Sequence, residues 1–153
     1  MNGRIRVDDE LSIGGQLTPE DIDSLRNEGF RSIIDLRDPC EPDMALWTHE
    51  EAEKAAWVGV VHVHCPVPVG ELARDRLDLF LETLSQLPKP CFVHGHNGRR
   101  AMAIAIVARA LEKGLSGEEA VGEAKARGVA FEDAEQEVFI RDSIDLYATT
   151  GPA

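Results

Sequence analysis

Residues 91–101, Cys-Phe-Val-His-Gly-His-Asn-Gly-Arg-Arg-Ala, contain the parts of an anion-binding loop. An apolar run ends in a glycine-bearing turn, two arginines follow, and an alanine-rich helix begins at once, which is how a strand, a nest of backbone N–H groups and a helix N-terminus meet around an anion. The Asn97-Gly98 pair tolerates the left-handed backbone of such a turn, and Arg100 can set its planar guanidinium against two phosphate oxygens. Gly95 offers neither a nucleophile nor a titratable proton. The segment therefore predicts anion binding, and position 95 supplies no group for catalysis.

The histidines near this loop allow further interpretations. We expect His94 to be a hydrogen-bonded residue at the base of the loop, while His96 could project over the pocket as a weak nucleophile or base. His62 and His64 alternate along one predicted strand and so share a face, and His94 and His96 form a second pair of the same spacing. Two such pairs could hold a metal ion, although no carboxylate stands at ligand spacing beside either pair.

The acidic residues divide into candidates for a general acid and expected surface positions. The candidates for an acid that reaches over the loop are Asp38, Glu41, Glu71 and Asp75. Among them, Asp75 is the candidate catalytic residue. An acid such as Glu132 or Asp133 could instead pair with Arg100. Acids of two predicted helices are assigned to solvated faces: Glu50, Glu51, Glu53, Glu132, Asp133, Glu135 and Glu137.

Local signals along the chain predict alternating strands and helices. The predicted strands are 4–7, 11–13, 31–36, 60–65 and 91–94. The predicted helices are 19–29, 43–57, 71–87, 101–113, 117–126 and 131–147. Thr18-Pro19 supplies a cap and a first turn, and Gly114 follows a last turn. Strands that alternate with helices of this length indicate an α/β fold, with a mostly parallel sheet covered on both faces.

This topology should bring several arginines together. Ligands of parallel sheets bind beyond the carboxyl ends of the strands, and the turns after Leu36 and His94 lie at such ends. Arg37, Arg99 and Arg100 could therefore form a local positive pocket in a chain of net charge −12.

Composition narrows the class of protein. With 153 residues and 43% hydrophobic content, a single domain over 1–153 is expected. The 28 acids against 16 bases would repel nucleic acids and anionic membranes, so neither is an expected partner. Three cysteines without metal or disulfide spacing favour a reducing compartment, and no apolar run approaches the ~20 residues that span a bilayer. We therefore expect a cytoplasmic protein without a cofactor, with Cys91 in its core.

The loop resembles that of a known family. Residues 94–100 are similar to the His-Cys-x-x-Gly-x-Arg signature of cysteine-dependent protein tyrosine and dual-specificity phosphatases, in the form used by a bacterial, beta-lactamase-hydrolase-like branch. Residues 11–21 and 29–37 resemble the opening strand, helix and strand of that branch. The resemblance covers about residues 5–126 and implies the three-layer α/β fold of tyrosine phosphatases.

The resemblance also implies roles for the loop residues. His94 would support the loop, and Arg100 would clamp the phosphate oxygens. The phosphate would be surrounded by the backbone amides of Gly95, His96, Asn97, Gly98, Arg99 and Arg100. Gly95 stands where the family has its catalytic cysteine, and deleting such a nucleophile typically lowers turnover by on the order of 10⁶.

The function that follows is a phosphatase-like domain whose partner is a phosphate-bearing ligand or a phosphoprotein. Either it is a natural pseudophosphatase that keeps its phosphate nest, or it is an inactivated variant of a working phosphatase. The alternatives are an active phosphoric monoester hydrolase that uses another nucleophile, such as His96 or water, and a His-rich metal-dependent hydrolase.

Overall fold

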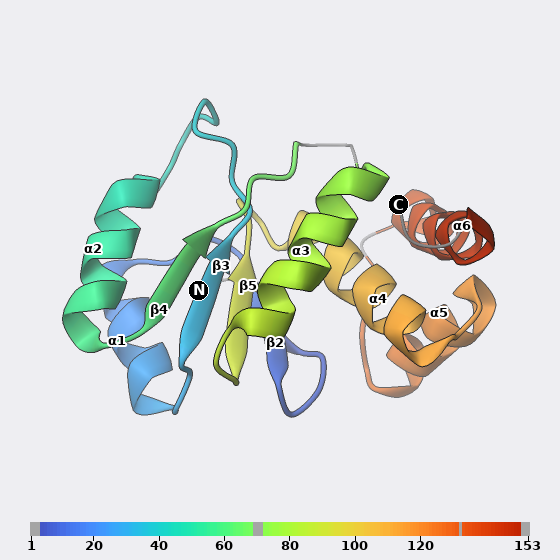
Figure 1. The fold of residues 1–153 in the computed structure, drawn as a ribbon, viewed down its shortest axis with the longest axis horizontal. Coiled ribbons are helices and arrows are strands. Elements are labelled where there is room, and N and C mark those ends of the chain that lie inside the picture. The colour runs from blue at the N-terminus through green and yellow to red at the C-terminus, as the bar shows by residue number, and fades with distance from the viewer. Residues whose placement is uncertain (1–3, 69–71, 132, 151–153) are drawn as a thin grey trace.

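The computed structural model describes residues 4–68, 72–131 and 133–150 (Figure 1). The strands are β1 Ile5–Arg6, β2 Leu11–Gly14, β3 Ser32–Asp35, β4 Val61–His64 and β5 Cys91–His94. The helices are α1 Pro19–Asn27, α2 Thr48–Val58, α3 Arg74–Gln86, α4 Arg99–Lys113, α5 Gly117–Ala126 and α6 Ala134–Thr150.

The strands form one mixed sheet in the order β1-β2-β5-β3-β4. β1 is antiparallel to β2, and the other neighbouring pairs are parallel. The registers align Gly14 and Asp35 with His94, so β2, β5 and β3 end at the same level. The turns that follow these strands therefore meet at one edge of the sheet, which confirms the predicted mostly parallel α/β fold.

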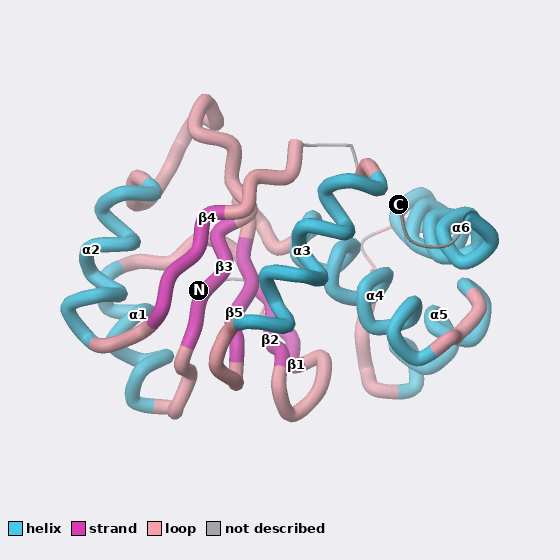
Figure 2. The backbone as a smooth tube through the Cα atoms, in the orientation of Figure 1, coloured by secondary structure: helices cyan, strands magenta, loops and turns pink. Residues whose placement is uncertain are grey.

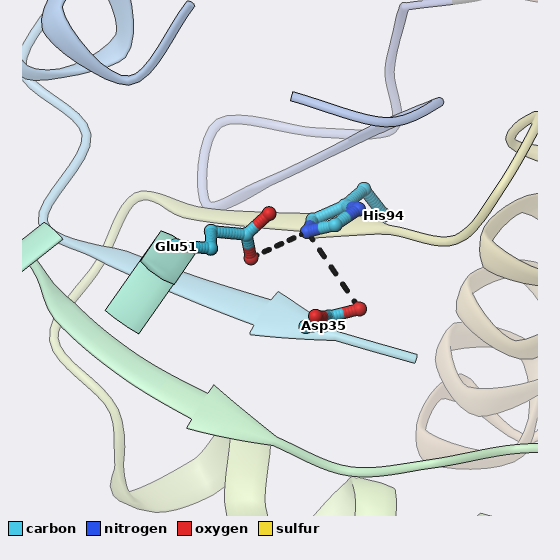
Figure 3. Close-up of side chains that lie close together, drawn as sticks. All are labelled: Asp35, Glu51 and His94. Carbon is cyan, nitrogen blue, oxygen red and sulfur yellow. Dashed lines mark hydrogen bonds and ion pairs between the residues drawn. The ribbon is translucent and has the colours of Figure 1, made fainter. Parts of the chain in front are cut away.

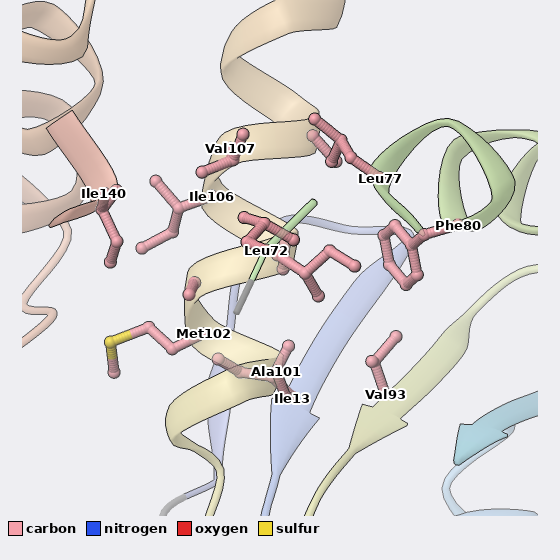
Figure 4. Packing of buried hydrophobic residues seen from close by; sticks show 14 of the residues in the cluster. Ile13, Leu72, Leu77, Phe80, Val93, Ala101, Met102, Ile106, Val107 and Ile140 are labelled. Carbon is pink, nitrogen blue, oxygen red and sulfur yellow. The ribbon is translucent and has the colours of Figure 1, made fainter. Parts of the chain in front are cut away.

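Helices cover both faces of the sheet (Figures 1 and 2). α1 and α2 lie on one face and α3 and α4 on the other, while α5 and α6 pack beside α4. The larger core surrounds α4, and Figure 4 shows Ile140 of α6 on one side of this helix and Leu77 and Phe80 of α3 on the other. α4 is alanine-rich because a helix enclosed on several sides needs small residues for close approach. Among the helices of the described residues, none is long and apolar enough to cross a membrane.

Two local features explain where the main elements begin. Thr18 caps α1 by accepting from the backbone N–H of Asp21, with Pro19 in the first turn, as the sequence predicts. Gly98 caps α4 with φ +87°, a left-handed conformation, and a Cβ at this position would stand 3.2 Å from the Gly14 carbonyl carbon. Glycine is therefore required at 98 both for its backbone conformation and for the close approach to the end of β2.

Three predicted helix starts were wrong. α2 begins at Thr48 and not at 43, because Asp43 has φ +56° and leaves the right-handed helical region. α3 begins at Arg74, and Glu71, the predicted start, lies outside the described residues. α6 begins at Ala134 and runs to 150, three residues later than predicted at both ends.

Candidate functional site

A pocket of about 690 Å³ opens at the carboxyl end of β5. Its lining includes His96, Asn97, Arg99 and Arg100, which belong to the predicted loop. Residues of the β3–α2 connection, of the β4–α3 connection and of α6 line its walls. The structure thus brings together the predicted loop residues and three segments distant in sequence.

Arg100, in the first turn of α4, is held at one end of its guanidinium. Nη1 donates to the carbonyl oxygens of Leu36 (3.2 Å) and Val67 (3.0 Å), and Nη1 and Nη2 each donate to one carboxylate oxygen of Glu41 (2.5 and 2.8 Å). Of the five N–H groups of an arginine, the Nε–H and the neighbouring Nη2–H find no acceptor among the described residues. An Nε–H and Nη2–H pair of an arginine can bind two oxygens of one anion side by side.

Gly95 lies beside the unoccupied side of this guanidinium. A Cβ built on Gly95 would stand 3.5 Å from both Nε and Nη2 of Arg100, an ordinary contact distance. The φ of Gly95 also lies outside the left-handed region. Position 95 can therefore carry a Cβ next to Arg100 without backbone strain.

The loop between β5 and α4 is held by one hydrogen bond from the β2–α1 connection and by one within the loop. The Gln16 backbone N–H donates to the His96 carbonyl oxygen (3.3 Å), and the Arg99 N–H donates to Asn97 Oδ1 (3.0 Å). The Arg99 amide is therefore occupied, which departs from the expected set of phosphate-binding amides. The other loop amides find no acceptor within the described part of the chain: those of Gly95, His96, Asn97, Gly98 and Arg100.

The two neighbouring arginines of the loop differ in their partners. Arg99 pairs with Asp133 at 3.2 Å, and both side chains are more than a third exposed. Arg100 pairs with Glu41, and both are about nine-tenths buried. The alternative of an acid pairing with Arg100 is thus realised by Glu41, while Asp133 takes the neighbouring arginine and Glu132 lies outside the described residues.

His94 is fully buried at the base of the loop. Figure 3 shows its ring close to Glu51 and Asp35. Its Nδ1 contacts the Gly95 carbonyl oxygen (3.2 Å) and its Nε2 contacts Glu51 Oε2 (2.8 Å). Burial by itself lowers the pKa of His94, but the hydrogen bond to Glu51 and the charges of Glu51 and Asp35 outweigh it, so the pKa is raised above its ordinary value.

The residues beneath His94 form a buried network of charges. Arg37 donates to both carboxylate oxygens of Asp35 (2.9 and 2.8 Å) and from Nη2 to Glu51 Oε1 (3.3 Å), and all three side chains are fully buried. Burial raises the pKa of Asp35, but the hydrogen bonds from Arg37 and the charge of His94 lower it to about 2. Burial likewise opposes the ionised Glu51, yet the hydrogen bonds from His62 and His94 keep its pKa below the usual value.

Two sequence assignments fail in this network. Glu51 is not part of a solvated face but is fully buried, because it lies one turn before the buried Ala55 on the sheet-facing side of α2. The i, i+4 spacing of Glu51 and Ala55 is the sequence signal that could have indicated the burial of Glu51. Arg37 does not line the pocket with Arg99 and Arg100, because its guanidinium forms ion pairs with the buried Asp35 and Glu51.

The four histidines do not converge as the metal-site alternative requires. His62 Nε2 contacts the same Glu51 oxygen as His94 (2.7 Å), whereas His64 Nε2 contacts the Arg37 carbonyl oxygen (2.6 Å) and His96 is exposed on the pocket. Among the described residues, Asp35, Glu51 and His94 are the one group close enough to hold a metal ion together. Both carboxylates already accept hydrogen bonds from Arg37, so a cation would have to displace a positive charge.

The candidates for a general acid have separate locations. Glu41 is bound to Arg100, and Asp75 is exposed and not among the described residues that line the pocket. Glu71 lies outside the described residues. Asp43 and Glu135 do line the pocket, although sequence reasoning did not propose either of them, because they come from connections and helices remote from the loop.

Comparison with known proteins assigns the family. Residues 5–142 match the family described as DSP-PTPase phosphatase fused to NAD+ kinase. The chain belongs to this family. Membership of the DSP-PTPase family confirms the resemblance seen in the loop and the opening strands.

Relatives of this DSP-PTPase domain agree with the assignment. A beta-lactamase hydrolase-like protein of Agrobacterium fabrum is 27% identical over 108 residues, which are 71% of this chain and 25% of that protein, so the chain spans about a quarter of its length. A structure from Neisseria meningitidis, solved as a candidate phosphatase, has a TM-score of 0.76 at 23% identity and covers 91% of this chain and 96% of that one. Pseudomonas aeruginosa TpbA, solved in complex with phosphotyrosine, has a TM-score of 0.64 at 15% identity and covers 97% and 91%. Identities this low in solved structures show the fold, which is the expected tyrosine-phosphatase-like one.

Proposed function

We propose that the loop from Gly95 to Arg100 binds the phosphate group of a phosphorylated ligand, and that this domain does so without the cysteine-dependent hydrolysis of its family. The observation that carries the proposal is the state of Arg100. Glu41 and two carbonyls fix one end of its guanidinium, and a neighbouring pair of N–H groups is left beside Gly95.

The surroundings of Arg100 support an anionic ligand. The loop amides without acceptors and the N-terminus of α4 add partial positive charge at the same end of the sheet. The phosphotyrosine bound to TpbA supports a phosphoric monoester as the ligand. We accordingly propose a phosphoprotein or a phosphorylated small molecule as the partner.

The lack of hydrolysis follows from position 95. A glycine there cannot form the phosphoryl-enzyme intermediate, and His96, the nearest other base in the loop, is exposed. Binding and charge stabilisation remain without the covalent step. If Gly95 is the natural residue, the domain would act as a pseudophosphatase. If Gly95 was engineered in place of a catalytic cysteine, the domain would be an inactivated phosphatase.

Sulfate titration tests the binding site, because sulfate is a stable mimic of the phosphate dianion. Arg100→Ala should weaken sulfate binding at least about tenfold, since it removes a charge-assisted pair of hydrogen bonds. Arg99→Ala is the matched control and should change the affinity less than about threefold, because Arg99 is committed to Asp133 in solvent. No sulfate affinity in the parent protein, or equal losses in the two variants, would contradict the proposal.

A further inference from the structure

The contacts of His94 define its protonation state. Nδ1 faces the Gly95 carbonyl oxygen and Nε2 faces a carboxylate oxygen of Glu51, and both oxygens can only accept. A neutral imidazole has one N–H and one lone pair, so it could satisfy only one of the two. Both contacts are hydrogen bonds only when His94 is an imidazolium.

The charges around His94 agree with that state. Asp35 and Glu51 contribute two negative charges, and Arg37 contributes one positive charge, all in fully buried side chains. A protonated His94 makes the buried group neutral, whereas a neutral His94 leaves one uncompensated buried charge. The raised pKa of His94 has the same cause.

The Gly95 carbonyl links this charge to the anion-binding loop. The peptide bond between residues 95 and 96 is planar and trans, so its N–H points opposite to its carbonyl. When His94 holds the Gly95 oxygen from beneath, the His96 N–H is directed away from His94. This N–H has no acceptor among the described residues, and His96 lines the pocket.

We propose that Glu51, contributed by a helix 43 residues before His94, is a positioning residue of the anion site. It keeps His94 doubly protonated, and His94 in turn holds the Gly95 carbonyl and thereby directs the His96 amide. The inference rests on the proposed function, because it assigns Glu51 a role in the same loop. It also predicts that anion affinity depends on the protonation of a residue that never touches the anion.

The groups that face His94 come from several elements. Asp35 of β3 lies 3.9 Å from its Nε2, and Arg37, just after β3, opposes protonation by its own charge. His62 of β4 contacts the same Glu51 oxygen through its Nε2. On the other side, β2 places the uncharged Gly14 beside His94. Among the described residues, Glu51 is the only charged group that hydrogen-bonds directly to the His94 ring.

The test follows ring protonation and sulfate affinity together from about pH 5.5 to about pH 9, a range in which sulfate stays a dianion. Nitrogen-15 NMR of the histidine rings should show both His94 nitrogens protonated at neutral pH. Sulfate affinity should fall as pH rises through the raised pKa of His94, in step with loss of the second ring proton. Glu51→Gln should lower the pH at which His94 loses that proton and weaken sulfate binding about tenfold near pH 8, with recovery in acid.

The matched control is Glu53→Gln, which removes the same charge from an exposed position on the same helix and should leave both readouts unchanged. The titration of the parent protein needs no variant, so the proposal can be tested even if Glu51→Gln does not fold. A neutral His94 ring at pH 7 overturns the inference. So does a folded Glu51→Gln variant with the parent's sulfate affinity and pH profile. If the parent binds no sulfate at all, the proposed function falls as well, which is a distinguishable result.

Discussion

The cluster beneath the loop and the pocket above it both contain arginines and carboxylates, but they satisfy these charges differently. Beneath the loop, Asp35, Arg37, Glu51 and His94 are fully buried and bonded to one another. In the pocket, Arg100 leaves two N–H groups without a described acceptor. Buried charges must be paired, so the cluster acts as a rigid support. The donors that Arg100 leaves over lie beside Gly95.

The largest expected effect changes the chemistry of the pocket without changing its support. Gly95→Cys places a thiol beside Arg100, where a Cβ fits at ordinary contact distance. Aryl phosphate hydrolysis should rise by at least about 10³-fold over the parent protein, because a nucleophile joins the proposed anion site. The assay is release of p-nitrophenol from its phosphate ester.

Gly95→Ser is the control for that experiment, since it adds a Cβ without a thiol. Rapid hydrolysis by the parent protein, at a rate comparable to that of the cysteine variant, would show that the domain already has another nucleophile. The pseudophosphatase interpretation would then be wrong.

The next largest effect removes the support itself. Arg37→Ala leaves Asp35 and Glu51 buried without their shared partner, and it should lower the free energy of unfolding by about 3–5 kcal/mol. Arg99→Ala, which breaks an exposed pair, should cost less than about 1 kcal/mol. Urea denaturation of both variants measures the contrast, and similar losses would show that the buried cluster is not a special support.

The pH dependence of stability should also come from the buried side. The pKa of Asp35 is lowered to about 2, so its contribution is complete above its ordinary pKa and is lost as pH falls toward 2. This loss amounts to about 2 kcal/mol. The pKa of His94 is raised, so its contribution is complete below its ordinary pKa and is lost as pH rises through the folded-state pKa.

Denaturation midpoints measured across the pH range should therefore fall at both extremes. Replacing His94 with glutamine should remove the decline on the alkaline side and keep the acidic one. A variant that retains the full alkaline decline would exclude His94 as its source.

The smallest of these effects concerns Gly98, where the start of α4 approaches Gly14 at the end of β2. Gly98→Ala and Gly29→Ala both place a Cβ at a positive φ, but only at Gly98 would that Cβ meet nearby backbone, at Gly14. Gly29→Ala should cost about 1 kcal/mol, and Gly98→Ala about 1 kcal/mol more. Equal losses in thermal unfolding would show that the close approach at Gly14 relaxes freely.

A feature of this molecule could be predicted from the sequence when the residues that determine it lie close together along the chain. The cap at Thr18, the buried run Cys91–His94 and the glycine after Lys113 are set within a few residues, and the structure has each of them. The start of α2 was wrong because the backbone at Asp43 turns left-handed within the β3–α2 connection, and the alanine-rich, acidic composition of 43–57 gave no sign of this turn.

The loop itself was visible in the sequence, since its glycines, arginines and histidine are contiguous, and so was the absence of a nucleophile at Gly95. The sequence did not show which side chains the loop residues contact. Glu41 reaches Arg100 across 59 positions and Glu51 reaches His94 across 43. Contacts of this kind depend on strand order and on which face of a helix is buried, so only the tertiary structure decided which carboxylate holds the arginine and which one holds the histidine.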